Sequence, residues 1–421
     1  MDHMREAAGG PVGATERSAL LDSLRGWALL GILTANMISF TGFFFIPDAE
    51  RGRMLGAEFD DAAELLLEWL VIGKFYALFS LLFGIGFAIQ IGRLEQRGEG
   101  AGRYLRRLGV LLLIGLAHLL LLWLGDILAL YALMGALLLL FRKASDKTLL
   151  CWAVALWLAP IAWSAAIHFG GMKPAEPIFR AAVRTLTAAG GVDINNPLAH
   201  FASPDIMAHL RSHPGEMFFR LGDLVYQMRF TKVLGMFLLG LWAGRRVIHS
   251  DPAAHRPLLR RVALIGLGVG LALSLAKAVL VMWPDGGPAL EFAGEVFYCL
   301  GTPVLALGYA AAFTLVWLGS QCRVAEVTAP AGRLALTNYL MQTVLQSALF
   351  YGWGFGLIGK LGLVFIFPIA TGMFALQIAY SRWWLARYRY GPIEWLWRSA
   401  TYGAAQPMRL GSPALTRTAV S

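Results

Sequence analysis

The sequence predicts an all-α fold, a polytopic transmembrane helical bundle of about ten spans with one small external helical loop region. Two observations support this class: hydrophobic residues make up 57% of the 421 residues, and charged residues only 15%. A soluble domain carries roughly 25% charged residues, so this chain lacks the polar side chains that cover a water-soluble body. The mean hydropathy of +0.60 agrees.

Apolar stretches recur along the chain, many of them near the roughly 20 residues that a helix needs to cross the hydrocarbon core. The predicted spans are 24–45, 74–92, 108–125, 127–141, 149–169, 230–246, 262–283, 297–319, 334–354 and 361–381. The sequence Gly301-Thr302-Pro303 interrupts the eighth span, and broken helices expose backbone groups for binding in transporters; a simple kink is the alternative.

These spans divide the chain into five parts. We expect a disordered cytoplasmic leader (1–19), a first transmembrane half (20–169), an extracytoplasmic loop or cap (170–229), a second transmembrane half (230–385), and a cytoplasmic interfacial helix with a tail (386–421).

The charge of the connecting segments predicts the orientation. Segment 92–107 carries five arginines against two glutamates, whereas 284–296 carries three acids and no base. Since positive loops stay on the cytoplasmic side, both termini are predicted to be cytoplasmic. The net charge of +10 is then explained by these loops, and no nucleic-acid partner is expected.

Polar residues inside the predicted spans are the candidates for function, because each is costly in lipid unless it is paired or hydrated. Asp22 and Arg25 are three residues apart and can pair on a helix. Arg25 and Asn36 are eleven apart, which returns to nearly the same helix face. A structural ion pair and an interhelical hydrogen bond are the alternative explanation.

His118 is the histidine predicted near the bilayer midplane, where an imidazole must face the bundle interior and can exchange a proton near neutral pH. Asp126 follows two turns later, beside the turn into the next span. The alternatives are a packing histidine and a helix cap.

Asn338, Gln342 and Gln346 form a polar stripe in the ninth span, at spacings of four residues. A stripe of this kind either joins two helices or lines a hydrated cavity. Ser80 could line the same cavity, and Lys74 is expected near the outer membrane face, where snorkelling is the alternative.

Three histidines of the long loop, His200, His209 and His213, include a pair with metal-ligand spacing. Pro214 and the polar surroundings favour a solvated surface instead. We expect no metal site and no tightly bound cofactor.

Six blocks of the sequence carry a family resemblance, and together they cover nearly the whole chain: 16–37, 74–90, 106–128, 232–245, 332–343 and 389–403. They resemble the bacterial YeiB-like family, a domain-of-unknown-function family distantly related to transmembrane acyltransferases such as the lysosomal heparan-α-glucosaminide N-acetyltransferase. The acetyltransferase branch has a histidine just before its second span, whereas residues 62–74 of this chain contain none. The resemblance implies a bacterial inner (plasma) membrane protein.

The acyltransferase hypothesis combines this resemblance with the polar residues. Acyl-CoA is the expected co-substrate, with its phosphates bound by arginines at the cytoplasmic entrance. His118 is the expected general base, Asp126 or Asn36 orients it, and Asn338 and Gln342 position the substrate. The entrance arginines are Arg103, Arg106 and Arg107.

The expected partners are the lipid bilayer, an acyl donor and a small-molecule or glycan acceptor. A homo-oligomer is also considered, because Gly266, Gly268 and Gly270 allow close helix approach. Two alternatives stay open: a transporter or flippase for a small amphiphile or anion, and a non-catalytic scaffold whose polar residues join helices.

Overall fold

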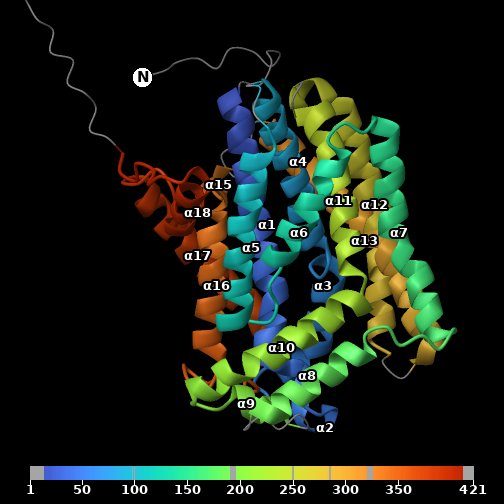
Figure 1. Ribbon diagram of the computed structural model, residues 1–421. Coiled ribbons are helices and arrows are strands. Elements are labelled where there is room, and N and C mark those ends of the chain that lie inside the picture. Colours follow the sequence, from blue (N-terminus) through green and yellow to red (C-terminus); the bar gives the residue numbers. More distant parts are fainter. Residues whose placement is uncertain are drawn as a thin grey trace, which may run out of the picture.

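The computed structural model describes residues 14–96, 98, 100–189, 196–248, 251–283, 286–319 and 326–410. Within these ranges the chain is helical, with short turns and two isolated β-bridges. Figure 1 shows the long helices side by side, with short helices crossing one end of the bundle. We call this the cap end; the first and last described residues lie toward the other end, the terminus end.

The helices of the bundle are α1 (Ala14–Thr41), α3 (Asp60–Leu70), α4 (Lys74–Gln96), α5 (Gly102–Leu121), α6 (Leu128–Leu138), α7 (Asp146–His168), α11 (Arg229–Ala243), α12 (Arg256–Val281), α13 (Gly287–Trp317), α16 (Ala335–Phe350) and α17 (Ile366–Leu385). The cap end holds α2 (Asp48–Arg51), α8 (Glu176–Ala189), α9 (Pro197–Phe201) and α10 (Ile206–Tyr226). The terminus end holds α15 (Ala329–Arg333) and α18 (Pro392–Tyr402).

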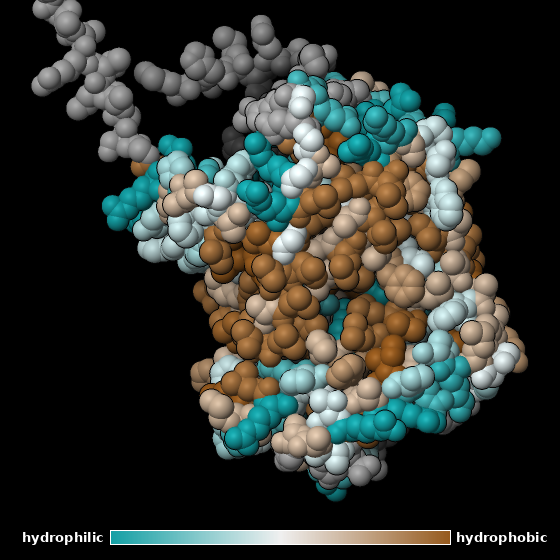
Figure 2. All heavy atoms as spheres, viewed as in Figure 1, coloured by the Kyte–Doolittle hydropathy of each residue, from teal (hydrophilic) through white to brown (hydrophobic). Residues whose placement is uncertain are grey.

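The predicted membrane bundle is confirmed. Among the described residues, 7 helical segments are long and apolar enough to cross a membrane, and the bent pair α10 and α11 makes up to 8. The apolar stretch Leu128–Phe141 is shorter, and α16 has 16 residues, so the predicted ten spans are approximate. Figure 2 shows a hydrophobic band between two hydrophilic ends, as a bilayer requires.

Three predicted features differ in the structure. Helix α1 begins at Ala14, inside the predicted leader, whose residues 1–13 lie outside the described residues. The second span extends over Ala57–Gln96, because α3 runs into α4 through a short turn. Helix α13 is continuous through Pro303; a proline removes one backbone hydrogen bond, and a long helix in a bundle tolerates that loss.

Glycines allow α12 and α13 to pack with their backbones in contact. A Cβ atom added at Gly266 would lie 2.4 Å from the Cα of Gly308, and one at Gly270 would lie 2.7 Å from the backbone nitrogen of Leu305. These two glycines therefore serve packing within the chain. At Gly268 no atom lies within 4 Å of the added Cβ, so this glycine alone stays available for the oligomer considered above.

The elbow between α10 and α11 is strained. The two helices are bent by 64°, and Met228 between them has a φ of 45°. Met228 is the one non-glycine residue with positive φ in the described part of the chain. Side chains rarely adopt this conformation, and it persists where the surroundings enforce it, often next to a functional site.

Candidate functional site

His118 stands in a hydroxyl–imidazole–carboxylate array. Its Nδ1 lies 3.0 Å from Oδ1 of Asp126, and its Nε2 lies 2.9 Å from Oγ1 of Thr343. The three residues come from α5, from the turn before α6 and from α16. A carboxylate on Nδ1 favours the tautomer whose Nε2 accepts a proton, so the array has the order nucleophile or acceptor, base and orienting acid.

Two further hydrogen bonds hold Asp126 in the position in which it contacts the imidazole. Its Oδ2 accepts a hydrogen bond of 2.8 Å from the backbone nitrogen of Ala129 at the start of α6. Its backbone carbonyl accepts one of 2.9 Å from Nη2 of Arg220 in the cap helix α10. One carboxylate oxygen of Asp126 thus caps α6 while the other contacts the imidazole. The helix cap and the orienting residue, which the sequence left as alternatives, are the same side chain.

The array is enclosed rather than open. The side chain of His118 is fully buried, and the rings of Trp123 and Tyr339 lie 6.4 Å and 5.3 Å from the imidazole. The Thr343 hydroxyl occupies the position next to Nε2 that an acceptor hydroxyl would take. A substrate therefore reaches the imidazole only when Thr343 or its neighbours move.

Arginines gather at the terminus end, where α1, α5 and α18 meet. Nη1 of Arg25 lies 2.8 Å from Oδ1 of Asp22, as predicted from their spacing. The guanidinium of Arg107 stacks 4.1 Å from the ring centre of Trp397, and Arg25 and Arg398 act on it as like charges. Within the described residues, Arg25, Arg107 and Arg398 lie near one paired carboxylate, that of Asp22, so positive charge exceeds negative charge here.

Two of the predicted arginines lie at the rim of this group. Arg103 and Arg106 are exposed, and the guanidinium of Arg103 lies 5.4 Å from the ring centre of Tyr402. Among the described residues outside its own helix, a Cβ added at Gly86 of α4 would have Nη2 of Arg25 as its nearest neighbour, at 3.8 Å. A guanidinium group of this kind can bind an anion by paired hydrogen bonds.

Each of the two inner arginines shares a helix face with a polar residue deeper in the bundle. Arg107 and His118 are eleven residues apart on α5, and Arg25 and Asn36 are eleven apart on α1. Eleven residues make three turns, so each pair shares a face and is separated by about 16 Å along its helix. Asn36 is partly exposed. Arg25 and Arg107 are close enough to act on each other as like charges.

The polar stripe of α16 joins this helix to α17. Nδ2 of Asn338 donates to Oγ of Ser381 over 3.0 Å, and Nε2 of Gln342 donates to Oε1 of Gln377 over 2.9 Å. Both side chains are buried. Of the two explanations left open, these contacts favour helix joining, and Asn338 and Gln342 do not meet the imidazole in the hydrogen bonds described.

Lys74 and Ser80 lie inside the bundle on α4. The ammonium of Lys74 is 1% exposed and donates over 2.6 Å to the backbone carbonyl of Glu68. Ser80 lies 2.7 Å from the hydroxyl of Tyr131. A snorkelling lysine would place its ammonium in the headgroups, so this explanation does not fit Lys74.

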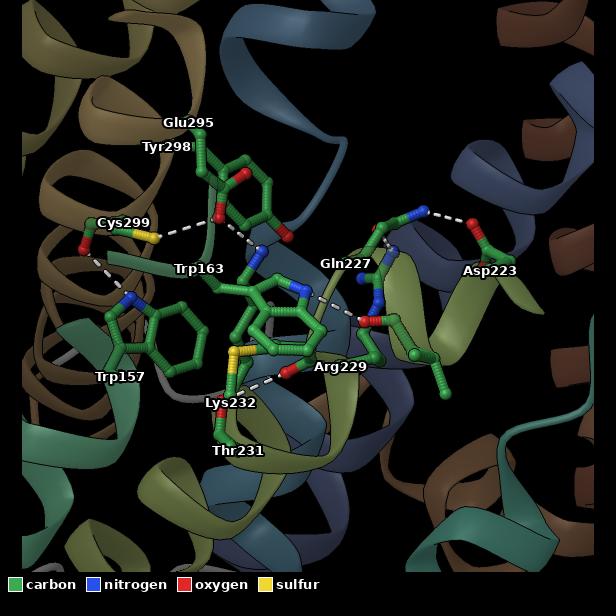
Figure 3. A network of polar contacts seen from close by, with 12 residues as sticks. Trp157, Trp163, Asp223, Gln227, Arg229, Thr231, Lys232, Glu295, Tyr298 and Cys299 are labelled. Carbon is green, nitrogen blue, oxygen red and sulfur yellow. Dashed lines mark hydrogen bonds and ion pairs between the residues drawn. The ribbon is translucent and has the colours of Figure 1, made fainter. Parts of the chain in front are cut away.

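A second group of charges lines a cavity toward the cap end; the sequence places Arg229 and Lys232 together near this side of the membrane, but its pattern did not identify Lys277 or Glu295 as members. Lys277 pairs with Glu68, and Lys232 pairs with Glu295. Figure 3 shows Lys232 and Glu295 pointing toward each other beside Tyr298. A lysine within a predicted span is a signal in itself: Lys277 lies inside the span predicted at 262–283, and it could have revealed this group.

The loop histidines are buried, so the predicted solvated surface is wrong. His200, His209 and His213 are 5–7% exposed. Burial lowers the pKa of His200 to about 4, and the neighbouring His209 and His213 add to the effect. Nε2 of His200 lies 3.1 Å from Oγ of Ser212. Across the described ranges, no group of three or more histidine, cysteine or acidic side chains could hold a metal ion.

Comparison with known proteins places the chain among relatives of similar length. Residues 243–404 match a family described as protein of unknown function (DUF418). The uncharacterised protein YxaH of Bacillus subtilis is 34% identical, over 94% of this chain and 97% of the relative. The uncharacterised protein YeiB of Escherichia coli is 30% identical, over 93% and 98%. No solved structure matches the chain.

Proposed function

This chain belongs to the DUF418, YeiB-like family of membrane proteins, and we propose that it is an acyltransferase that moves an acyl group from an acyl-CoA donor to a hydroxyl or amine acceptor. The hydrogen-bonded array of Thr343, His118 and Asp126 carries the proposal. We place the protein in the bacterial inner membrane, with the terminus end and its arginines toward the cytoplasm, because positive segments favour that side.

The donor would bind with its phosphates at the arginine group. Arg25 and Arg107 are the inner members and Arg103 and Arg106 the outer ones. Guanidinium groups bind phosphate by paired hydrogen bonds. In acyl-CoA a flexible arm separates the thioester from the phosphates. Such an arm could span the distance of about 16 Å along α5 between Arg107 and His118.

The chemical step then needs a base at the far end of that arm. Nε2 of His118 takes the proton of the acceptor, whose oxygen or nitrogen attacks the thioester carbonyl. The carbon–sulfur bond breaks, and the imidazolium returns the proton to the departing thiolate. Asp126 stabilises the imidazolium. Asn36, which shares a face with Arg25, would donate to the acyl oxygen as charge develops there.

Release of the CoA thiol tests this proposal. The purified protein is incubated with acetyl-CoA and a mixture of amine and hydroxyl acceptors, and free thiol is measured. His118→Ala should lower the rate by about 10²- to 10⁴-fold, the range for general acid–base catalysis. His168→Ala, at the cap end of α7, is the matched control. A His118→Ala protein that folds and releases thiol at the normal rate would refute the assignment.

Thr343 can be tested separately. Thr343→Val removes the hydroxyl that lies on Nε2 and retains the shape of the side chain. If Thr343 only fills the acceptor position, the variant keeps activity; if it is itself acylated, activity is lost and the acyl group found on Thr343 of the wild type by mass spectrometry is absent.

Transport of a small amphiphile or anion is the second candidate. The transport hypothesis partly depended on a break in the eighth span, and α13 is continuous there. The charged cavity toward the cap end supports transport instead. Transport predicts that a labelled substrate enters liposomes without covalent change and that the protein releases no thiol from acyl-CoA.

A further inference from the structure

We propose that the cavity toward the cap end is a binding site for an amphiphilic monoanion, a ligand with one acidic head on an apolar body. This goes beyond the proposed function, because the site lies among α3, α7, α11, α12 and α13 and contains none of the array around His118. The cavity has a volume of about 510 Å³, within the range of sites that enclose small molecules.

Arg229 supplies the site for the acidic head. It begins α11, directly after the strained Met228, and it lines the cavity. Its Nη2 donates to Oε1 of Gln227, and its guanidinium lies 4.5 Å from the ring centre of Tyr76. Its Nε is buried and has no hydrogen-bond partner among the described residues. A buried donor on a cation without a partner is costly, and an anion would satisfy it.

The two lysines that line the cavity are each paired with a glutamate. Nζ of Lys232 lies 2.7 Å from Oε1 of Glu295, and Lys277 pairs with Glu68. At the exposed side, Oε2 of Glu291 lies 3.3 Å from Nδ1 of His168, and its side chain is 57% exposed. Water screens this outer carboxylate. Within the described residues Arg229 forms no ion pair, so one negative charge fits the cavity.

Figure 3 shows how Arg229 is held. Gln227 bridges it to Asp223, and the indole of Trp163 lies beside these residues. The bridge orients the guanidinium, and the Asp223 carboxylate at its far end attracts the charge of Arg229 without forming a direct ion pair. Asp223 in turn pairs with Arg220, with a distance of 2.9 Å between Oδ2 and Nη1.

The remaining wall suits an apolar body. Aromatic and aliphatic side chains from several helices line it: Ile72, Trp163, Ile167, Leu280, Leu290 and Tyr298. Figure 2 shows the hydrophobic band hollowed on one face, with hydrophilic atoms visible at depth. A fatty acid or an acidic lipid would place its chain along such a wall and its head on the cation.

Equilibrium binding to the full-length protein in detergent tests this proposal, with no acyl donor present. The probes are octanoate and oleate, each compared with the neutral alcohol of the same chain length (octanol and oleyl alcohol), and all are radiolabelled. We expect at least one of the acids to bind more tightly than its matching alcohol by about tenfold or more, since a hydrogen-bonded charge is worth that much. Binding of octanoate identifies a soluble acid as the natural class, and binding of oleate alone identifies a membrane lipid.

Two variants locate the site. Arg229→Gln should weaken anion binding by about tenfold or more, while Arg211→Gln, on an exposed part of α10, should leave it unchanged. Ile72→Trp fills the cavity without changing charge and should abolish binding; this variant decides the question if Arg229→Gln does not fold. The proposal would be overturned if neither acid bound more tightly than its matching alcohol, or if folded Arg229→Gln or Ile72→Trp bound the preferred acid normally.

Discussion

Removing one partner of the ion pair between Lys232 and Glu295 gives the sharpest test of the packing around the cavity. The Lys232 side chain is 2% exposed and that of Glu295 is 24% exposed, with 2.7 Å between their charged atoms. Glu295→Gln leaves a buried ammonium without its counter-charge. Breaking a buried pair costs about 3–5 kcal/mol, and because the carboxylate is partly hydrated we expect a loss of about 3 kcal/mol in the free energy of unfolding.

Unfolding by SDS in mixed micelles, followed by circular dichroism, measures this loss. Lys232→Met combined with Glu295→Leu should be much closer to the wild type than Glu295→Gln alone, because two apolar side chains leave no buried charge. The matched control is Glu176→Gln, which removes an exposed partner of Arg180 on α8 and should leave stability nearly unchanged. A loss for Glu295→Gln as small as that of the control would show that the pair is hydrated and would refute the reasoning.

Three further predictions concern the cap and the polar stripe. Met228→Gly should raise the free energy of unfolding by about 1 kcal/mol, because glycine adopts a φ of 45° without strain. A decrease of the same size would mean that the contacts of the methionine side chain stabilise the fold by more than the backbone strain destabilises it. The pKa of His200 is about 4 instead of 6.5, so between these values the unfolded chain binds a proton that the folded chain does not. This contribution of His200 should therefore be lost as the pH falls from about 6.5 to about 4, while the buried Glu216 beside it, whose pKa burial raises to about 7, acts in the opposite direction. The melting temperature of the wild type relative to that of His200→Phe should fall over this range, and a constant difference would contradict the assignment. Gln377→Leu removes the partner of Gln342 and should lower stability by about 1–2 kcal/mol without affecting thiol release; a selective loss of thiol release would instead assign the stripe to the substrate.

Much of the fold follows from hydrophobic length alone. Helices α7, α12 and α16 lie close to the spans predicted from apolar windows, because a run of apolar residues in lipid must close its own backbone hydrogen bonds. The pairing of Asp22 with Arg25 follows from helical spacing, since residues three apart share a face. Such local relations can be read directly from the sequence.

The long-range contacts could not be predicted in the same way. Thr343 lies 225 residues from His118 in sequence, and Lys277 lies 209 residues from Glu68. No spacing rule relates residues on different helices, so their meeting depends on which helices pack together. The sequence identified His118 and Asp126 as polar groups at depth, but their third partner became visible only with the arrangement of α5 beside α16.

The cap helix α10 is held to the array around His118 by hydrogen bonds to backbone atoms. Arg220 donates to the carbonyl of Asp126, and Nδ1 of His213 lies 2.9 Å from the carbonyl oxygen of Leu120. The cap is thus an integral part of the bundle and not a separable module. If the cap of a relative replaced this one, the two hydrogen bonds would form only where the new segment carries an arginine and a histidine at the positions of Arg220 and His213. The carbonyl groups that accept these bonds belong to the backbone and are present whatever the sequence of the bundle.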